Sequence, residues 1–238
     1  MININSSRYK NLFFTYLISD QLSKGTIMLL DGLPSNPLNK EKLMENLAKK
    51  NYDVFFPRYE GTWESKGEFL KRSPSEIIIE FISILKRGIK IKNKEYKAKK
   101  IFILGSSFGG GIGLDIASQQ DFIDKICVTS PVISFRKVKG IETLENFLKN
   151  AHKDHYHFNP KNWKKLIKDK ILNLEINKIK RPKDILIIIG NCDDQIKDKE
   201  IIEFGNRHKI QVRSYKFGHI TLSKIPEYML KEIINFFS

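Results

Sequence analysis

The feature that most constrains this chain is a short stretch in which a strand, a tight turn and a helix follow one another. Four apolar residues, 101–104, run directly into the motif Gly105-Ser106-Ser107-Phe108-Gly109, and a helix-compatible segment, 112–119, comes next. In such an elbow the central serine lies on a strained turn with its hydroxyl exposed, and the glycines leave room for neighbouring backbone. Ser107 is therefore the candidate nucleophile, and Ser106 is the alternative.

Segments with the patterns of strands and helices alternate on both sides of this elbow. The helical segments have apolar residues three and four positions apart, whereas the strand segments are continuous apolar runs or alternate. This order predicts an α/β protein with a mostly parallel central sheet and helices on both faces. The predicted strands are 12–18, 26–30, 53–57, 101–104, 123–129, 185–189 and 210–217.

Residues 132–183 break this alternation. They contain helical periodicity around 141–148 and 163–179, many lysines and no convincing strand. A connection of about fifty residues is too long to be a bare loop in a compact domain. We therefore expect a helical cap insertion over the edge of the sheet, within one α/β domain that covers residues 1–238.

The chain is strongly basic, with 42 lysines and arginines against 27 aspartates and glutamates and a net charge of +15. Such a field favours anionic substrates, acidic lipid or nucleic acid. The charges are scattered, however, and no nucleic-acid-binding motif accompanies them, so a general lysine bias is the simpler interpretation and no nucleic-acid partner is expected. The basic segment 86–100 precedes a strand and should lie far from the carboxyl ends of the strands, where sites of α/β sheets form.

Cysteine content and hydropathy indicate in which cellular compartment the protein is expected. Two cysteines, Cys127 and Cys192, cannot make a disulfide framework, which fits a reducing environment. No apolar run approaches the roughly 20 residues of a membrane helix, and the short apolar segment 12–19 lacks a signal-peptide cleavage site. We expect a soluble, cytoplasmic protein without a transmembrane segment. The oligomeric state is not indicated.

Three polar residues follow three separate predicted strands: Ser107, Asp193 and His219. Because the carboxyl ends of parallel strands meet at one edge of a sheet, these side chains are expected to converge. A serine hydroxyl needs a histidine to take its proton, and a buried carboxylate holds that histidine in the right tautomer. The alternatives are Asp194 for the acid and His208 for the base, although His208 falls in a predicted helix.

This arrangement resembles the α/β-hydrolase superfamily over nearly the whole chain. The resemblance rests on the elbow, on Asp31-Gly32-Leu33 as an oxyanion loop, on Gly190-Asn191-Cys192-Asp193 as an acid loop and on Gly218-His219 as a histidine loop. It implies an oxyanion hole made by the backbone N–H groups of Leu33 and Phe108. Most relatives have histidine where this chain has Asp31, so that carboxylate should point away from the oxyanion, toward N–H groups of the loop. The opening antiparallel strands of the family look shortened here.

Two other patterns are weaker. His152, His155 and His157 lie close together but lack a second ligand cluster at metal-binding spacing, so a polar cap segment is the better interpretation. The glycines at 109–111 and 113 do not form a dinucleotide-binding motif. No metal or cofactor is therefore expected. Trp63 and Trp163 are equally consistent with an acyl pocket and with core or cap packing.

The resemblance implies a serine hydrolase that cleaves a small-molecule carboxylic ester or thioester through an acyl-enzyme on Ser107. The same triad also serves peptidases and acyltransferases, and these stay open as alternatives. A non-catalytic binding protein of the same fold is the alternative from another class.

Overall fold

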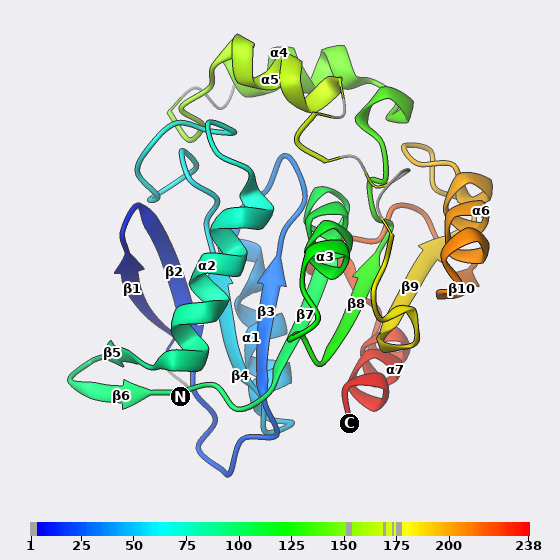
Figure 1. Ribbon diagram of the computed structural model, residues 1–238. Helices are drawn as coiled ribbons and strands as arrows, with labels where there is room; N and C mark the ends of the chain where they lie inside the picture. Colours follow the sequence, from blue (N-terminus) through cyan, green and yellow to red (C-terminus); the bar gives the residue numbers. More distant parts are fainter. Residues whose placement is uncertain (1–3, 151–153, 169, 173, 175–177) are drawn as a thin grey trace.

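A computed structural model of the chain describes residues 4–150, 154–168, 170–172, 174 and 178–238. An eight-stranded sheet lies at its centre, with the strand order β1-β2-β4-β3-β7-β8-β9-β10 (Figure 1). From β4 to β10 neighbouring strands are parallel. The strands are β1 (Asn5–Tyr9), β2 (Leu12–Leu17), β3 (Thr26–Leu30), β4 (Asp53–Pro57), β7 (Ile101–Ser106), β8 (Lys125–Thr129), β9 (Ile185–Gly190) and β10 (Gln211–Tyr215).

The sheet opens with an antiparallel pair that is more complete than the sequence indicated. β1 pairs with β2 over five residues, from Asn5 opposite Tyr16 to Tyr9 opposite Leu12, and β2 is antiparallel to β4. The expectation of shortened opening strands is therefore wrong. β1 escapes prediction because its sequence, Asn-Ser-Ser-Arg-Tyr, is polar, as an edge strand can be.

Helices cover both faces of the sheet, which confirms the predicted fold class. Side chains alternate along each central strand, so that Met28 and Ile103 face one core while Ile27 and Phe102 face the other. The first core includes residues of α2, α3 and α6, and the second includes residues of α1 and α7 (Figure 1). These helices are α1 (Glu41–Ala48), α2 (Pro74–Arg87), α3 (Phe108–Gln119), α6 (Asp198–His208) and α7 (Glu227–Phe237).

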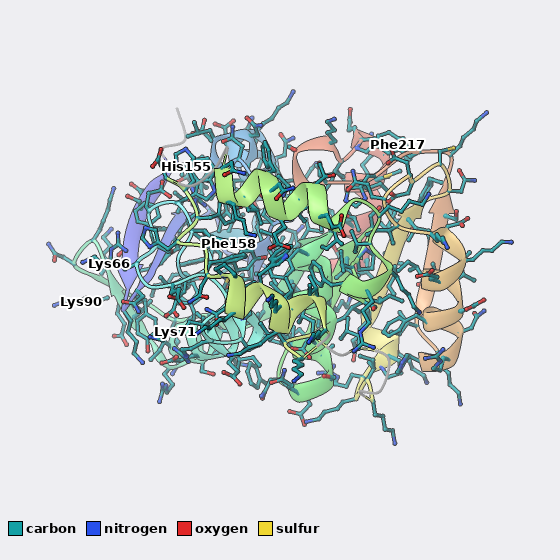
Figure 2. The ribbon with its side chains drawn as sticks, turned by 90° about the horizontal axis from the view of Figure 1, so that it is seen from above. Lys66, Lys71, Lys90, His155, Phe158 and Phe217 are labelled. Atoms are coloured by element: carbon teal, nitrogen blue, oxygen red, sulfur yellow. The ribbon has the colours of Figure 1, made fainter. Side chains whose placement is uncertain are left out.

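Between β8 and β9 the chain leaves the sheet and forms two helices, α4 (Ile141–Asn150) and α5 (Pro160–Ile167), beyond the carboxyl ends of the strands (Figure 1). Figure 2 looks down on them and shows His155 and Phe158 in the segment between the two helices. This segment is attached to the loop after β4, because the N–H of Trp63 donates to the carbonyl of His155 at 2.7 Å. The predicted second helix ends at Ile167 rather than near residue 179.

A small hairpin, β5 (Ile89–Ile91) with β6 (Lys94–Tyr96), occupies the basic segment after α2. The sequence did not predict it, since lysines outnumber apolar residues there. The hairpin lies at the end of the sheet opposite to α4 and α5, as expected for this patch (Figure 1). Among the described residues, no helix has the length and apolar character needed to cross a membrane.

Candidate active site

Ser107 occupies the turn between β7 and α3 with a backbone conformation that side chains rarely adopt. Its φ is 51° and its ψ is −117°. The turn is tight because two glycines permit close backbone contacts: a Cβ on Gly105 would lie 2.5 Å from the carbonyl oxygen of Gly109, and one on Gly109 would lie 2.1 Å from that of Leu30. The strained turn that the glycine pattern predicted is therefore present in the structure.

The two serines of the elbow have different surroundings. The side chain of Ser106 is fully buried, and its Oγ accepts a hydrogen bond from the N–H of Leu222 at 3.3 Å. Ser107 lies instead on the wall of a cavity beneath α4. Of the two, Ser107 is therefore the residue that a ligand in this cavity would contact.

The predicted oxyanion loop lies directly against this serine. A Cβ added to Gly32 would be 3.1 Å from the Cβ of Ser107 and 3.6 Å from its Oγ. Leu33 and Phe108 line the same cavity as Ser107. Phe108 is also the first residue of α3, and the first N–H groups of a helix have no acceptor within the helix. Both predicted oxyanion residues thus lie on the wall of the same cavity as Ser107.

Asp31 turns away from the cavity, as the sequence suggested. Its Oδ1 accepts a hydrogen bond from the N–H of Gly32 at 2.9 Å. Its Oδ2 forms an ion pair with Nζ of Lys40 at 2.6 Å, and both side chains are buried. Burial raises the pKa of Asp31, although Lys40 and the Gly32 N–H act in the opposite direction. Lys40 was not predicted, because in sequence it is one lysine among many.

His219 and Asp193 meet at the carboxyl ends of β9 and β10. Nδ1 of His219 lies 2.8 Å from Oδ2 of Asp193. The other carboxylate oxygen accepts from the N–H groups of Gln195 at 2.9 Å and Ile196 at 3.1 Å. Burial alone would raise the pKa of Asp193, but His219 and these N–H groups outweigh it and hold the pKa below its ordinary value. The carboxylate is thus kept ionised beside the imidazole.

The histidine loop is held by two residues, Thr129 and Ser130, that the sequence patterns did not single out. The Oγ1 of Thr129 donates to the carbonyl of Ile220 at 3.1 Å, and the N–H of Ile220 donates to Oγ of Ser130 at 3.2 Å. A Cβ on Gly190 would lie 2.2 Å from the carbonyl oxygen of Gly218, so the acid and histidine loops touch through backbone. The available sequence signal for this role was the position of Thr129 and Ser130 at the carboxyl end of a strand, β8.

The alternative acid and base lie elsewhere. Asp194 is exposed, next to the residue that pairs with His219. His208 is the last residue of α6, where its ring packs on Phe204 with the centroids 4.5 Å apart.

A cavity of about 390 Å³ separates the elbow from the helix α4. This volume is at the lower end of the roughly 300–1,000 Å³ of small-molecule sites. The lining is mainly apolar, and Lys139 is its one charged residue among the described residues. The walls are formed by Leu33, Pro34, Ser107, Phe108, Val132, Phe135, Val138, Lys139, Gly140, Thr143, Leu144, Phe147, Gln195 and Ile196.

The other singled-out residues have packing roles where they are described. His155 stacks on Trp63 with the ring centroids 4.1 Å apart, and Nδ1 of His157 lies 2.7 Å from the carbonyl oxygen of Gly67. His152 is outside the described residues. Within the part of the chain that the structure describes, no group of histidines, cysteines and carboxylates could hold a metal ion. Trp163 is buried against Phe158 and against Phe135, a residue of the cavity wall, but does not itself line the cavity.

The fold is that of an α/β-hydrolase. The family model described as serine aminopeptidase, S33, matches residues 21–178, and the chain belongs to this hydrolase family. No curated protein matches the chain in sequence.

Solved structures support the same fold. The chain is similar to the esterase Pf2001 of Pyrococcus furiosus, with a TM-score of 0.74, 20% identity and coverage of 99% of this chain and 90% of that one. It is also similar to a monoacylglycerol lipase of Paleococcus ferrophilus, with a TM-score of 0.63, 17% identity and coverage of 95% and 98%. The α/β hydrolase GrgF of a Penicillium species gives a TM-score of 0.70 at 13% identity, with coverage of 99% and 98%.

Proposed function

We propose that this protein is a serine hydrolase that cleaves a small carboxylic ester or thioester through an acyl-enzyme on Ser107. The observation that carries the proposal is the position of Ser107. It lies on a turn with φ of 51°, on the wall of an apolar cavity and against the oxyanion loop. The His219–Asp193 hydrogen bond at the same edge of the sheet supports it.

In the proposed mechanism Oγ of Ser107 attacks the substrate carbonyl carbon while Nε2 of His219 takes the hydroxyl proton. Asp193 accepts from Nδ1 of His219, which keeps Nε2 unprotonated before the attack and stabilises the imidazolium after it. The N–H groups of Leu33 and Phe108 stabilise the tetrahedral oxyanion. His219 then protonates the leaving group, and a water molecule activated by His219 hydrolyses the acyl-enzyme.

The cavity supports a small, mainly apolar acyl group. We propose that residues 132–183 act as a cap, since α4 contributes Thr143, Leu144 and Phe147 to the cavity wall. Apolar side chains bind a hydrocarbon chain by removing its surface from water. The similar structures include proteins named as an esterase and a monoacylglycerol lipase, which accords with an acyl ester substrate.

A peptidase is the second candidate, because the matching family is named for an aminopeptidase. An aminopeptidase must bind a cationic substrate amine, for which a carboxylate is the usual partner. The described lining of the cavity contains no carboxylate and one lysine. The ester is therefore the favoured substrate, and equal or faster turnover of alanine p-nitroanilide than of p-nitrophenyl butyrate would reverse this order.

Labelling with a fluorophosphonate probe tests the proposal. The wild type should become labelled, Ser107→Ala should not, and Ser106→Ala should still be labelled because Ser106 lies behind the elbow. A folded wild type that fails to react would contradict the proposal, as would labelling of Ser107→Ala. A rate series over p-nitrophenyl esters of increasing acyl length, with a CoA thioester beside it, would then define the acyl group.

A further inference from the structure

A buried ion pair lies directly behind the oxyanion loop. Asp31 and Lys40 have side chains that are 6% and 4% exposed, and Oδ2 of Asp31 is 2.6 Å from Nζ of Lys40. Asp31 precedes Gly32, the residue packed against Ser107. An uncompensated carboxylate here would oppose the negative charge that develops on the substrate oxygen, because charges interact strongly where water is excluded.

The pair also connects the two ends of the oxyanion loop. Oδ1 of Asp31 accepts the N–H of Gly32 at 2.9 Å, while Nζ of Lys40 donates to the carbonyl of Asn36 at 3.0 Å. On the other side, the hydroxyl of Tyr59 donates to the carbonyl of Asp31 at 2.8 Å. The loop between Asp31 and Asn36 is thus held by side chains at both ends, beside the nucleophile.

We propose that Asp31 and Lys40 are positioning residues of the oxyanion hole. The carboxylate of Asp31 fixes Gly32 against Ser107, and the ammonium of Lys40 cancels the charge of that carboxylate. This inference rests on the proposed function and deepens it. It explains how an aspartate occupies a position next to a site that must stabilise a negative charge.

The other ionisable groups around Asp31 do not substitute for Lys40. Burial raises the pKa values of Tyr59 and Tyr156, so both stay neutral near pH 7. Arg58, also near Asp31, has its guanidinium 3.3 Å from the carboxylate of Glu64. Ser35 contributes a neutral hydrogen-bonding group to Asp31. Lys40 is thus the cation in direct contact with Asp31 among the described residues.

Replacing Lys40 by methionine separates the charge effect from packing. In Lys40→Met the carboxylate is uncompensated wherever it is ionised, so at the alkaline end of the pH range kcat for p-nitrophenyl butyrate should fall about 100-fold, the size of losing one oxyanion donor, with little change in KM. The ratio of variant to wild-type kcat should rise as the pH is lowered, because protonation of Asp31 removes its charge. Using the ratio cancels the pH dependence that the two proteins share.

The double variant Asp31→Asn/Lys40→Met provides the second arm. An asparagine retains an oxygen for the Gly32 N–H and carries no charge, so the double variant should recover at least tenfold in kcat over Lys40→Met and show a ratio to wild type that does not change with pH. Lys42→Met, which removes an exposed lysine of α1, is the matched control and should behave as wild type.

Three outcomes would overturn the inference: an unchanged kcat in Lys40→Met at every pH, a loss that is the same at every pH, or, at alkaline pH, a double variant as impaired as the single one. If Lys40→Met does not fold, the double variant decides alone, and a kcat more than 100-fold below wild type would contradict the inference. Failure of the proposed function is distinguishable, since the wild type would then neither hydrolyse the ester nor react with a fluorophosphonate.

Discussion

Asp193 fixes the orientation of His219 because both of its carboxylate oxygens have partners. One oxygen accepts from Nδ1 of the imidazole at 2.8 Å, and the other accepts from two backbone N–H groups. The carboxylate therefore has little freedom to rotate. Because Asp193 accepts from Nδ1 of His219, it favours the tautomer in which that nitrogen carries the proton.

Asp193→Asn should retain the fold and lower kcat by about 10³- to 10⁴-fold. The amide can donate to Nδ1 and so favour the tautomer in which Nε2 is protonated, which is the wrong one for a base. Asp194→Asn is the control, since Asp194 is exposed, and should change kcat less than twofold. Steady-state kinetics with p-nitrophenyl butyrate measure both variants, and similar kcat values for the two would contradict the assignment of Asp193.

The same residue should contribute to stability in a pH-dependent way. The pKa of Asp193 is lowered on folding, so its contribution is present above the unfolded value of about 4 and is lost as the pH falls through the folded value. Between pH 6 and pH 3 the wild type should therefore lose more free energy of unfolding than Asp193→Asn does. Urea unfolding at both pH values measures this difference. An equal loss would mean that the pairing does not depend on ionisation.

At this scale the sequence identified residues that follow strands but not those that act through tertiary contacts. Ser107, Asp193 and His219 each follow an apolar run, and each has a glycine nearby. Their positions after strands could therefore be predicted from the sequence. The position of Lys40 could not, because its burial depends on how the loop after β3 folds back on Asp31.

Among the elements, the elbow between β7 and α3 depends on glycines that admit neighbouring backbone. Gly109→Ala places a Cβ 2.1 Å from the carbonyl oxygen of Leu30, so the strand, the helix or the oxyanion loop must move. We expect a loss of about 1–3 kcal/mol in the free energy of unfolding, measured by urea titration, together with reduced ester hydrolysis.

Gly113→Ala is the matched control for this substitution, because it lies in the same helix. A Cβ at Gly113 would be 3.3 Å from side-chain methyl groups of Ile103 and Val128, which can adjust more easily than backbone. Alanine also favours helix by about 1 kcal/mol over glycine. If Gly113→Ala lowered the free energy of unfolding more than Gly109→Ala, the close backbone contact would not explain why position 109 requires glycine.

The helix α4 should determine which acyl groups are accepted. Leu144→Ala removes part of the cavity wall and should lower kcat/KM for p-nitrophenyl hexanoate about tenfold more than for the acetate, since burial of a leucine side chain contributes about 1.5–3 kcal/mol. Asn146→Ala, an exposed position of the same helix, should leave both values unchanged. An equal decrease in kcat/KM for both esters in Leu144→Ala would indicate that the acyl group does not bind against α4.

The elements that sequence patterns predicted best are the buried ones. The strands β3, β4, β7, β8 and β9 each contain a continuous apolar run, because helices cover both faces of the sheet there. The edge strand β1 and the hairpin β5–β6 consist largely of polar or charged residues, so hydrophobic periodicity gave no signal for them. The end of α5 at Ile167 was equally hidden, since apolar spacing continues beyond it.

On the scale of the whole molecule, the parallel sheet brings together residues that are far apart in the chain. Ser107, Asp193 and His219 follow β7, β9 and β10, whose carboxyl ends lie at one edge of the sheet. Sequence order and strand polarity were sufficient to predict the contact between Asp193 and His219. The shape of the cavity was not predictable, because it depends on where the segment between β8 and β9 packs.

The basic surface is distributed rather than gathered at the site. The hairpin β5–β6 lies at the end of the sheet opposite to α4 and α5 (Figure 1). Lys139 is the one charged residue in the described lining of the cavity. The net charge of +15 is therefore not concentrated in the described lining of this cavity.

The most direct test of the account is to trap the acyl-enzyme and locate it. The protein is mixed with p-nitrophenyl butyrate, quenched in acid within the first turnovers, digested and analysed by mass spectrometry. The account predicts a butyryl group on Ser107, and no adduct on the corresponding peptide of Ser107→Ala. Rapid release of p-nitrophenol with a butyryl group on another residue, or with Ser107→Ala as active as the wild type, would contradict it.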